Sequence, residues 1–242
     1  MITVMFSVFN EEKNIAKAVE NAIDAAKRAG NIPLDIIVVD DASTDKTPEI
    51  IKKLEKKYPF VRSIHHLKNQ GIGVGLREVI KIAKYPKFML APGDNDASPK
   101  LLEHIFRNST KAEMVLSYYL NKELRKRTRN FLSTIYGLIY MLTFDVYIQY
   151  FNGVGVYPTE KIRNLDLKSS RFSITAELNT KLLCSGCTLY ELPGYMQTGI
   201  EGSKSIKLIN FIEVIVTYFR LVYEIKLTKR DFFAHKPRRI EV

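Results

Sequence analysis

The sequence predicts an α/β fold, in which a mostly parallel central sheet carries helices on both faces. Two observations support this class. Short apolar segments rich in Ile, Val and Phe alternate along the first half of the chain with longer segments whose apolar residues recur every three or four positions. The short segments are apolar almost throughout, which is typical of strands that are buried on both faces of a parallel sheet.

The first strand and the first helix begin this alternation. Residues 2–9, "ITVMFSVF", predict the strand, and residues 11–30 predict the helix. We expect Asn10 to cap the N-terminus of this helix and Gly30 to end it. The apolar stripe that faces the sheet is expected to consist of Ile15, Val19, Ala22, Ile23 and Ala26.

The same pattern continues to residue 119. Further strands are predicted at residues 34–40, 61–67, 87–91 and 112–119. Further helices are predicted at residues 47–58, at residues 73–84, and directly after Ser98 and Pro99. In open sheets of this class, ligands bind beyond the carboxyl ends of the strands. The residues that follow each strand are therefore the place to look for a site.

Composition and charge narrow the possible partners. The chain has 242 residues, 46% of them hydrophobic, and a formal net charge of +11. Such a chain buries a core and is not disordered. Its excess of Lys and Arg favours phosphorylated small molecules, nucleic acid or an acidic membrane surface. No nucleic-acid-binding motif occurs, so we expect no nucleic-acid partner. The N-terminus has no basic leader or cleavage signature, so we expect a cytoplasmic protein.

The two cysteines lie together in "CSGC", as Cys184 and Cys187. No second Cys or His pair is near them in the sequence, which argues against a zinc site. We expect two small, half-buried residues near the end of an element, and a redox pair is the alternative.

Acidic residues follow three of the first four predicted strands. They are Glu11 and Glu12 after the first, Asp40, Asp41 and Asp45 around the end of the second, and Asp94 and Asp96 after the fourth. Helix capping explains some of them but not the whole set. Several hard oxygen ligands at one edge of a sheet indicate a Mg²⁺ or Mn²⁺ ion that carries a phosphate-bearing substrate.

Four of these segments together resemble a known family. They read "FSVFNEEKNI", "VVDDASTDKT", "KNQGIGVGLREVIKIA" and "PGDNDASP", in this order. The chain resembles the inverting glycosyltransferases of family 2 over residues 2–205, which we take as the catalytic domain. The resemblance implies the nucleotide-sugar A-type fold and a nucleotide-diphosphate sugar as the donor.

The resemblance also implies roles for donor-side residues. Asp41 would contact the base or ribose of the donor, and Glu11 would lie nearby. Ser7 and Phe9 stand where the family has Pro-Thr-Tyr, and Arg77 would point towards the donor. Two alternatives stay open: Asp40 caps the following turn, and Arg77 is an ordinary solvated helix residue. The glycines of "NQGIGVG" do not have dinucleotide-loop spacing, so we reject that interpretation.

The metal would be held by the motif that follows the fourth strand. The resemblance assigns the metal to Asp94, with Asp96 as a second oxygen ligand, and both count as catalytic residues. The family's D-x-D motif lacks its first acid here, which puts metal dependence in question. Two carboxylates, donor phosphates and water still complete an octahedral site.

The second half of the chain resembles one branch of the family, the polyprenyl-phosphate (dolichyl-type) sugar synthases. Arg129 and Ser133 match the spacing of an Arg and a Ser that bind the lipid phosphate there, and Lys204 lies in a matching "GSK" segment. Glu177 is a weak candidate for the general base that a hydroxyl acceptor needs. A lipid phosphate needs no base, which favours that acceptor. The alternatives are a saccharide hydroxyl in cell-surface glycan synthesis and a nucleotide-binding scaffold that has lost catalysis.

Residues 206–242 are expected to form an amphipathic helix and a basic tail. Polar residues follow one another at helical spacing: Lys207, Asn210, Glu213, Thr217, Arg220 and Glu224. A helix that crosses a bilayer would have to bury them in lipid. We therefore predict a helix that lies on the cytoplasmic face of an anionic membrane, without a transmembrane span. The alternative is a core helix or the contact of a homo-oligomer.

Overall fold

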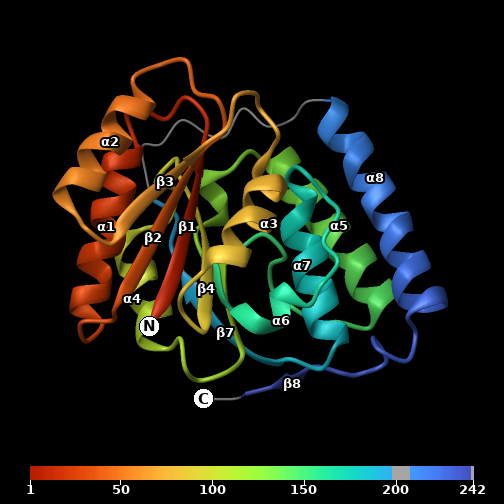
Figure 1. Ribbon diagram of the computed structural model, residues 1–242. Helices are drawn as coiled ribbons and strands as arrows, with labels where there is room; N and C mark the ends of the chain where they lie inside the picture. Colours follow the sequence, from red (N-terminus) through yellow and green to blue (C-terminus); the bar gives the residue numbers. More distant parts are fainter. Residues whose placement is uncertain (198–207, 241–242) are drawn as a thin grey trace.

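The computed structural model describes residues 1–197 and 208–240, whose central feature is one mixed β-sheet (Figure 1). In the described residues its strand order is β3-β2-β1-β4-β6-β5-β7-β8. The strands are β1 (Ile2–Val8), β2 (Leu34–Asp40), β3 (Val61–His65), β4 (Lys87–Pro92), β5 (Met114–Tyr119), β6 (Gly155–Pro158), β7 (Thr188–Gly194) and β8 (Arg238–Arg239). Of these described strands, only β6 runs antiparallel to its neighbours, β4 and β5, so the predicted, mostly parallel sheet is confirmed.

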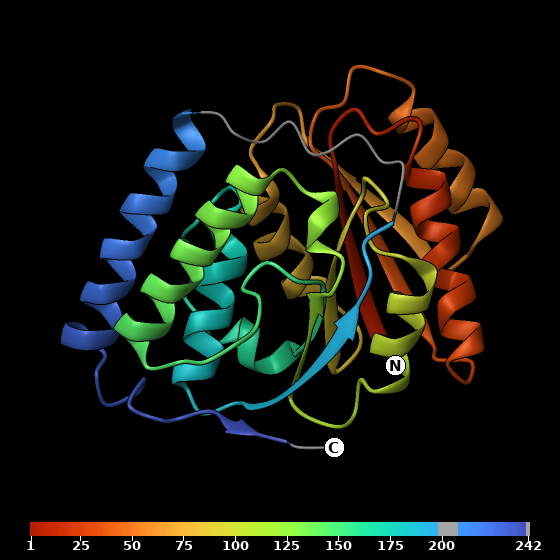
Figure 2. The ribbon, with the colours of Figure 1, turned by 180° about the vertical axis from the view of Figure 1, so that it is seen from behind.

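The helices cover both faces of this sheet, as predicted (Figures 1 and 2). They are α1 (Ile15–Arg28), α2 (Thr47–Lys57), α3 (Ile72–Ile82), α4 (Pro99–Arg107), α5 (Arg127–Phe144), α6 (Thr159–Arg163), α7 (Ser173–Cys184) and α8 (Leu208–Val222). A short 3₁₀ turn, Lys122–Leu124, precedes α5, and π-helical residues Tyr223–Thr228 continue α8.

Alternate residues of the strands divide the core into two layers. Phe6 of β1 packs into the layer under α1, α2 and α4, whereas its neighbour Met5 packs into the layer under α3, α6 and α7. The inner strands β1 and β2 are therefore buried on both sides, which explains their largely apolar sequences, whereas β3 at the edge of the sheet is only partly buried. The carboxyl ends of β1, β2, β3 and β4 consequently meet at one edge of the sheet.

The first helix begins at Ile15, later than the predicted start, and Asn10 does not cap it. Asn10 adopts a φ of 57°, and its side-chain oxygen accepts a hydrogen bond from the Thr44 backbone N–H at 2.8 Å. The backbone N–H of Glu11 donates to Thr47 Oγ1 at 2.9 Å. Hydrogen bonds to the loop after β2 thus replace the local cap that the sequence indicated. The helix predicted directly after Ser98 and Pro99 is confirmed as α4, and the Ser98 side chain caps it by accepting the Leu101 N–H at 3.2 Å.

The helix α8 turns its polar stripe towards the protein. Glu213 Oε1 accepts the backbone N–H groups of Ser170 and Arg171, both at 2.9 Å, and Thr217 Oγ1 lies 3.1 Å from Ser169 Oγ. Residues on the opposite side of the helix are apolar and exposed: Ile212, Ile215, Val216, Phe219 and Tyr223. Among the described helices, none combines the length and the apolar character needed to cross a membrane.

Candidate active site

The loop that follows β4 crosses the end of β1 at very close range. Gly93 is the residue in contact, because a Cβ added there would lie 2.3 Å from Val8 Cγ1 and 2.9 Å from the Ser7 carbonyl oxygen. Only glycine fits this approach. The segment "PGDND" is therefore held against the strand end that carries Ser7, and the expected meeting of strand ends is observed.

Asp94 and Asp96 lie on this loop as a partly buried acidic pair. Asn95 between them has a φ of 62°, and its side-chain oxygen accepts a hydrogen bond from Asn21 Nδ2 at 2.9 Å. The backbone N–H of Asp96 donates to Asp94 Oδ1 at 3.2 Å. Burial raises the pKa of both carboxyl groups, and the charge of Asp94 raises the pKa of Asp96 further. The two carboxylates carry like charges and are partly shielded from water. A nearby cation would therefore stabilise them.

This pair fits part of the ligand set of a divalent metal ion. Mg²⁺ and Mn²⁺ prefer carboxylate oxygens and keep several non-protein ligands. In the described part of the chain, no group of three or more His, Cys, Asp or Glu side chains is placed to hold a metal. Asp94 and Asp96 would therefore supply two ligands, and diphosphate oxygens and water would have to supply the others.

Arg125 approaches the acidic pair and is a site residue that the sequence did not reveal. Its Nη2 lies 3.8 Å from Asp96 Oδ2, and its Nη1 donates to the Tyr150 hydroxyl at 2.6 Å. Its guanidinium lies 5.2 Å from the ring centre of Tyr119 and 5.4 Å from that of Tyr150. The sequence hints at Arg125 only through the basic run "RKRTR" shortly after two tyrosines. In such a run the sequence does not distinguish a buried arginine from a solvated one.

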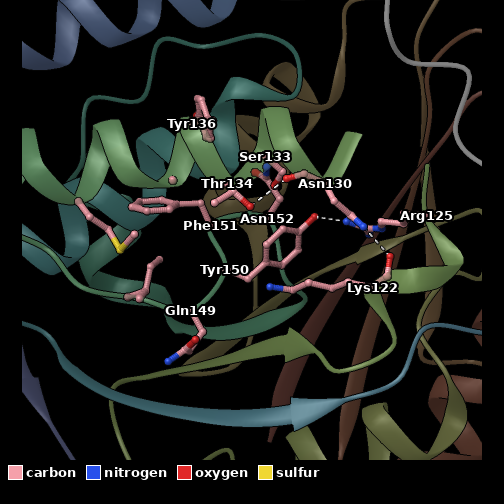
Figure 3. Close-up of a pocket in the computed structure, with 13 residues that line it drawn as sticks. Lys122, Arg125, Asn130, Ser133, Thr134, Tyr136, Gln149, Tyr150, Phe151 and Asn152 are labelled. Carbon is pink, nitrogen blue, oxygen red and sulfur yellow. Dashed lines mark hydrogen bonds between the residues drawn. The ribbon is translucent and has the colours of Figure 1, made fainter. Parts of the chain in front are cut away.

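A hollow of about 130 Å³ opens beside Arg125 (Figure 3). Figure 3 shows Arg125, Lys122 and Asn130 at one end of it and Phe151 towards the other. Its lining consists of Lys122, Arg125, Asn130, Ser133, Thr134, Tyr136, Gly137, Met141, Ile148, Gln149, Tyr150, Phe151 and Asn152. The hollow thus joins a cationic, hydrogen-bonding end to an apolar end.

The two residues expected to bind the acceptor, Arg129 and Ser133, both come from α5. Ser133 lines the hollow. Arg129 is half-buried, and its positive charge lowers the pKa of Asp94 and of Asp96, although burial outweighs this effect. The cation of this pair thus acts on the two acids, and the hydroxyl lies at the hollow. Lys204, the third expected residue, lies outside the described residues.

The carboxylates at the end of β2 have hydrogen-bond partners within the protein. Asp40 Oδ1 accepts the Ser43 N–H at 3.0 Å, so it caps the following turn, which was the alternative interpretation. Asp41 Oδ1 accepts the Gln70 N–H, and Asp41 Oδ2 accepts the Gly71 N–H, both at 2.8 Å. Asp41 is buried. Its carboxylate shapes the loop between β3 and α3.

The other donor-side residues lie around the same edge. Ser7 is half-buried at the end of β1, and the Phe9 side chain is 48% exposed beyond it. Glu11 Oε2 accepts a hydrogen bond from Asn14 Nδ2 at 2.8 Å. Arg77 is not simply solvated, because its Nη1 donates to the Ser169 carbonyl oxygen at 2.7 Å. Arg77 therefore fixes the loop before α7 next to the start of α3.

The glycines of "NQGIGVG" serve this same contact between loops. A Cβ at Gly71 would lie 2.3 Å from the Ser170 carbonyl oxygen, and one at Gly73 would lie 2.1 Å from that of Ser169. The Gly73 N–H donates to the Ser170 carbonyl oxygen at 2.8 Å. The glycines are explained by backbone packing, in agreement with the rejection of a dinucleotide loop.

Glu177 is placed inside the core, not in the site, which corrects its expected role as a general base. Its side chain is fully buried, and it accepts the backbone N–H groups of Lys168 and Ser169. Lys181 Nζ lies 3.0 Å from its Oε1, and Arg220 Nη2 lies 3.3 Å from its Oε2. Burial alone would raise the pKa of Glu177, but Lys181 and the bonds from Ser169 lower it. A carboxylate held in this way cannot reach a substrate proton.

Comparison with known proteins establishes the family. Residues 3–157 match the model of Glycosyl transferase family 2. This match covers more than half of the chain, and the chain belongs to this family.

Several relatives are similar over most or part of the chain. An uncharacterized protein of Methanocaldococcus jannaschii is 30% identical over 213 residues, which are 79% of each chain. A dolichyl-phosphate beta-glucosyltransferase of Trichomonas vaginalis is 23% identical over 150 residues, 57% of this chain and 45% of that one. A second M. jannaschii protein is matched over 65% of its length and an uncharacterized Mycobacterium bovis protein over 25%, so the chain spans only part of these relatives.

Solved structures share the fold at low sequence identity. Glucosyl-3-phosphoglycerate synthase of Mycobacterium tuberculosis, in complex with Mg²⁺ and UDP, superposes with a TM-score of 0.69 at 15% identity, over 91% of this chain and 78% of that one. TarS of S. aureus, in complex with UDP-GlcNAc, gives a TM-score of 0.61 at 17% identity, over 94% of this chain and 66% of that one. The fold of the chain is thus that of nucleotide-sugar-dependent glycosyltransferases.

Proposed function

We propose that this protein transfers a sugar, with inversion, from a nucleotide-diphosphate sugar to the phosphate of a polyprenyl lipid. One observation carries the proposal: in a family 2 fold, the acidic pair Asp94 and Asp96 lies near Arg125 and Arg129, and Arg125 also lines a hollow with an apolar end. Two opposite charge clusters side by side suit a reaction between two phosphate-bearing substrates.

The donor is proposed to bind at the strand edge, with Ser7 and Phe9 on its nucleoside side. Asp94 and Asp96 would hold a Mg²⁺ or Mn²⁺ ion, which would neutralise charge on the departing diphosphate. The raised pKa of both groups supports this role, because a bound cation would offset the cost of burying their charges and the repulsion between them. Structural neighbours solved with Mn²⁺ or Mg²⁺ and UDP also support it.

The acceptor is proposed to bind through its phosphate to Arg129 and Ser133, with Arg125 beside them. A guanidinium and a hydroxyl are good ligands for phosphate oxygens. The interior position of Glu177 also favours a phosphate acceptor, because a phosphate is already anionic near pH 7 and needs no base. A saccharide hydroxyl would need a base, and Glu177 was the residue that the sequence offered for that task.

The acceptor proposal predicts a selective loss in Arg129→Gln. A hydrogen bond to a charged group contributes about 1.5–3 kcal/mol, so kcat/KM for a polyprenyl phosphate should fall roughly 10- to 150-fold. Initial rates at varied acceptor concentration measure this, and the exposed neighbour Lys126→Gln serves as the control. If Arg129→Gln and Lys126→Gln behave alike, the residue does not bind the acceptor.

The exposed surface of α5 and α8 supports a membrane-bound acceptor. Both helices lie on the same side of the molecule (Figure 2), and Thr143 Oγ1 contacts the Tyr218 hydroxyl at 2.8 Å. We call their exposed apolar side chains the apolar face: Phe131, Leu132, Ile135, Leu138, Ile139, Leu142, Ile212, Ile215, Val216, Phe219, Tyr223 and Leu227. Basic residues follow in "KLTKRDFFAHKPRR". We propose that this face lies on an anionic membrane, which would bring the site to a lipid acceptor.

Vesicle flotation tests this membrane contact. The wild type should float with anionic vesicles, and high salt should weaken the binding. Each large apolar side chain contributes about 1.5–3 kcal/mol when buried, so Val216→Glu with Phe219→Glu should reduce binding at least about tenfold. Phe60→Glu, an exposed apolar residue between α2 and β3, is the control. Wild-type protein that floats with no vesicle contradicts the proposal. A dimer that the double variant dissociates would assign the face to a homo-oligomer.

A further inference from the structure

The histidine His66 has a buried side chain that lies between two carboxylates. It is found at the edge of the sheet where the donor nucleotide is proposed to bind. His66 Nδ1 is 2.7 Å from Asp41 Oδ1, and His66 Nε2 is 3.0 Å from Glu78 Oε2. The His66 side chain is only 4% exposed, whereas that of Glu78 on α3 is 41% exposed. The proposed transfer reaction does not use His66.

The geometry fixes the protonation state of the ring. A neutral imidazole has one N–H donor and one acceptor nitrogen. Both nitrogens of His66 face carboxylate oxygens at hydrogen-bond distance, so only the doubly protonated ring donates to both. Burial by itself lowers the pKa of His66, but the bonds to Asp41 and Glu78 outweigh it and raise the pKa above its usual value. The neighbouring His65 pairs separately, through its Nδ1 at 3.0 Å from Asp40 Oδ2.

The same Asp41 carboxylate holds the loop between β3 and α3. It accepts the N–H groups of Gln70 and Gly71, and Gly71 has a φ of 89° directly before α3. The Asp41 N–H donates to the Val8 carbonyl oxygen at 2.9 Å, which ties this arrangement to the end of β1. A proton lost from His66 would leave the lone pair of one ring nitrogen facing a carboxylate in a buried position.

We propose that His66, as an imidazolium ion, is a positioning residue for the donor nucleotide. It holds the Asp41 carboxylate in the orientation that fixes the backbone of Gln70 and Gly71 beside the end of β1. The inference rests on the proposed function, because it assumes that the donor binds at this edge. His66 itself does not touch the reacting atoms.

The sign of the pH effect follows from the pKa of His66. Because folding raises this pKa, the contribution of His66 is complete below the ordinary value of about 6.5 and is lost as the pH rises through the raised value. The titratable groups that face the ring are Asp41 at the end of β2 and Glu78 from α3.

The test is calorimetric titration of UDP with Mn²⁺ into the full chain across neutral and alkaline pH. Wild-type affinity should fall as the pH rises. His66→Gln should bind UDP about tenfold more weakly at low pH and should lose the pH dependence. Glu78→Gln should keep the low-pH affinity and move the midpoint to lower pH, because one of the two bonds that raise the pKa is gone. His65→Gln and the exposed His104→Gln are matched controls that should keep the wild-type profile.

Two measurements on the protein without nucleotide separate this inference from the proposed function. Nitrogen NMR of the His66 ring should show both nitrogens protonated at neutral pH. Amide hydrogen exchange at Gln70 and Gly71 should be faster in His66→Gln than in His65→Gln at the same pH. A wild type that binds UDP while His66→Gln keeps the same affinity and pH profile overturns the inference. If no nucleoside diphosphate binds in the presence of Mn²⁺, the proposed function fails. A neutral ring or unchanged amide exchange would overturn the positioning role separately.

Discussion

Replacement of Asp94 by asparagine is expected to lower kcat for sugar transfer at least about a hundredfold. A divalent metal ion stabilises charge in the transition state by several kcal/mol, and each 1.36 kcal/mol is a factor of about ten in rate. Asparagine has nearly the same shape as aspartate, so the loop that crosses the end of β1 at Gly93 should keep its conformation. The substitution removes the negative charge that is proposed to hold the metal. The loss should appear in initial rates at saturating donor and metal.

The same substitution should not destabilise the fold. Burial raises the pKa of Asp94, so ionisation of this group opposes folding above its ordinary pKa in the metal-free protein. Asp94→Asn should therefore melt at the wild-type temperature or slightly above it, which separates lost catalysis from lost structure. The exposed Asp24→Asn on α1 is the control for charge alone. If Asp94→Asn turns over at the wild-type rate and EDTA has no effect on that rate, a divalent metal has no part in the transfer.

The largest loss of stability is expected for Lys181→Met. Lys181 is fully buried on α7, where its Nζ lies 3.0 Å from Glu177 Oε1 and 2.8 Å from Glu224 Oε2. Removal of one member of a buried ion pair costs about 3–5 kcal/mol, because the remaining charge loses its partner. At about 2–4 °C for each kcal/mol in a chain of this size, the melting temperature should fall by roughly 6–20 °C.

Scanning calorimetry measures this loss, and two variants control it. Lys53→Met removes an exposed lysine of α2 and should leave the melting temperature nearly unchanged. Glu177→Gln combined with Lys181→Met should melt above Lys181→Met, because one uncompensated carboxylate is removed with the lysine. A Lys181→Met protein as stable as Lys53→Met would mean that the network around Glu177 does not hold α7 and α8 together.

The fold class was predictable because a pattern local to each segment decides it. Continuous apolar strands such as Ile36–Val39 cannot be placed at a surface, and amphipathic helices between them leave only a sheet covered on both faces. The same logic placed Ser7, Asp41 and Asp94 at one edge, since the ends of parallel strands meet. Topology therefore supplied the location of the site.

The partners of individual side chains were not predictable, because they come from elsewhere in the chain. Asn10 bonds to the loop after β2 in place of capping α1, and Asp41 is satisfied by the loop after β3. Arg125 could not be chosen from its basic run, since burial between Tyr119 and Tyr150 depends on the folded chain. For α8, spacing identified a polar stripe but not the direction in which it faces.

The transfer reaction of the wild-type protein tests the central claim most directly. The full chain is incubated with a panel of nucleotide-diphosphate sugars and Mn²⁺ or Mg²⁺, with a polyprenyl phosphate or with a saccharide acceptor, and the product is analysed by mass and by the configuration at its anomeric carbon. We predict that a sugar phospholipid of inverted configuration forms from at least one donor and that EDTA prevents its formation. Transfer to the saccharide alone, or no turnover of any donor with the lipid, would contradict it.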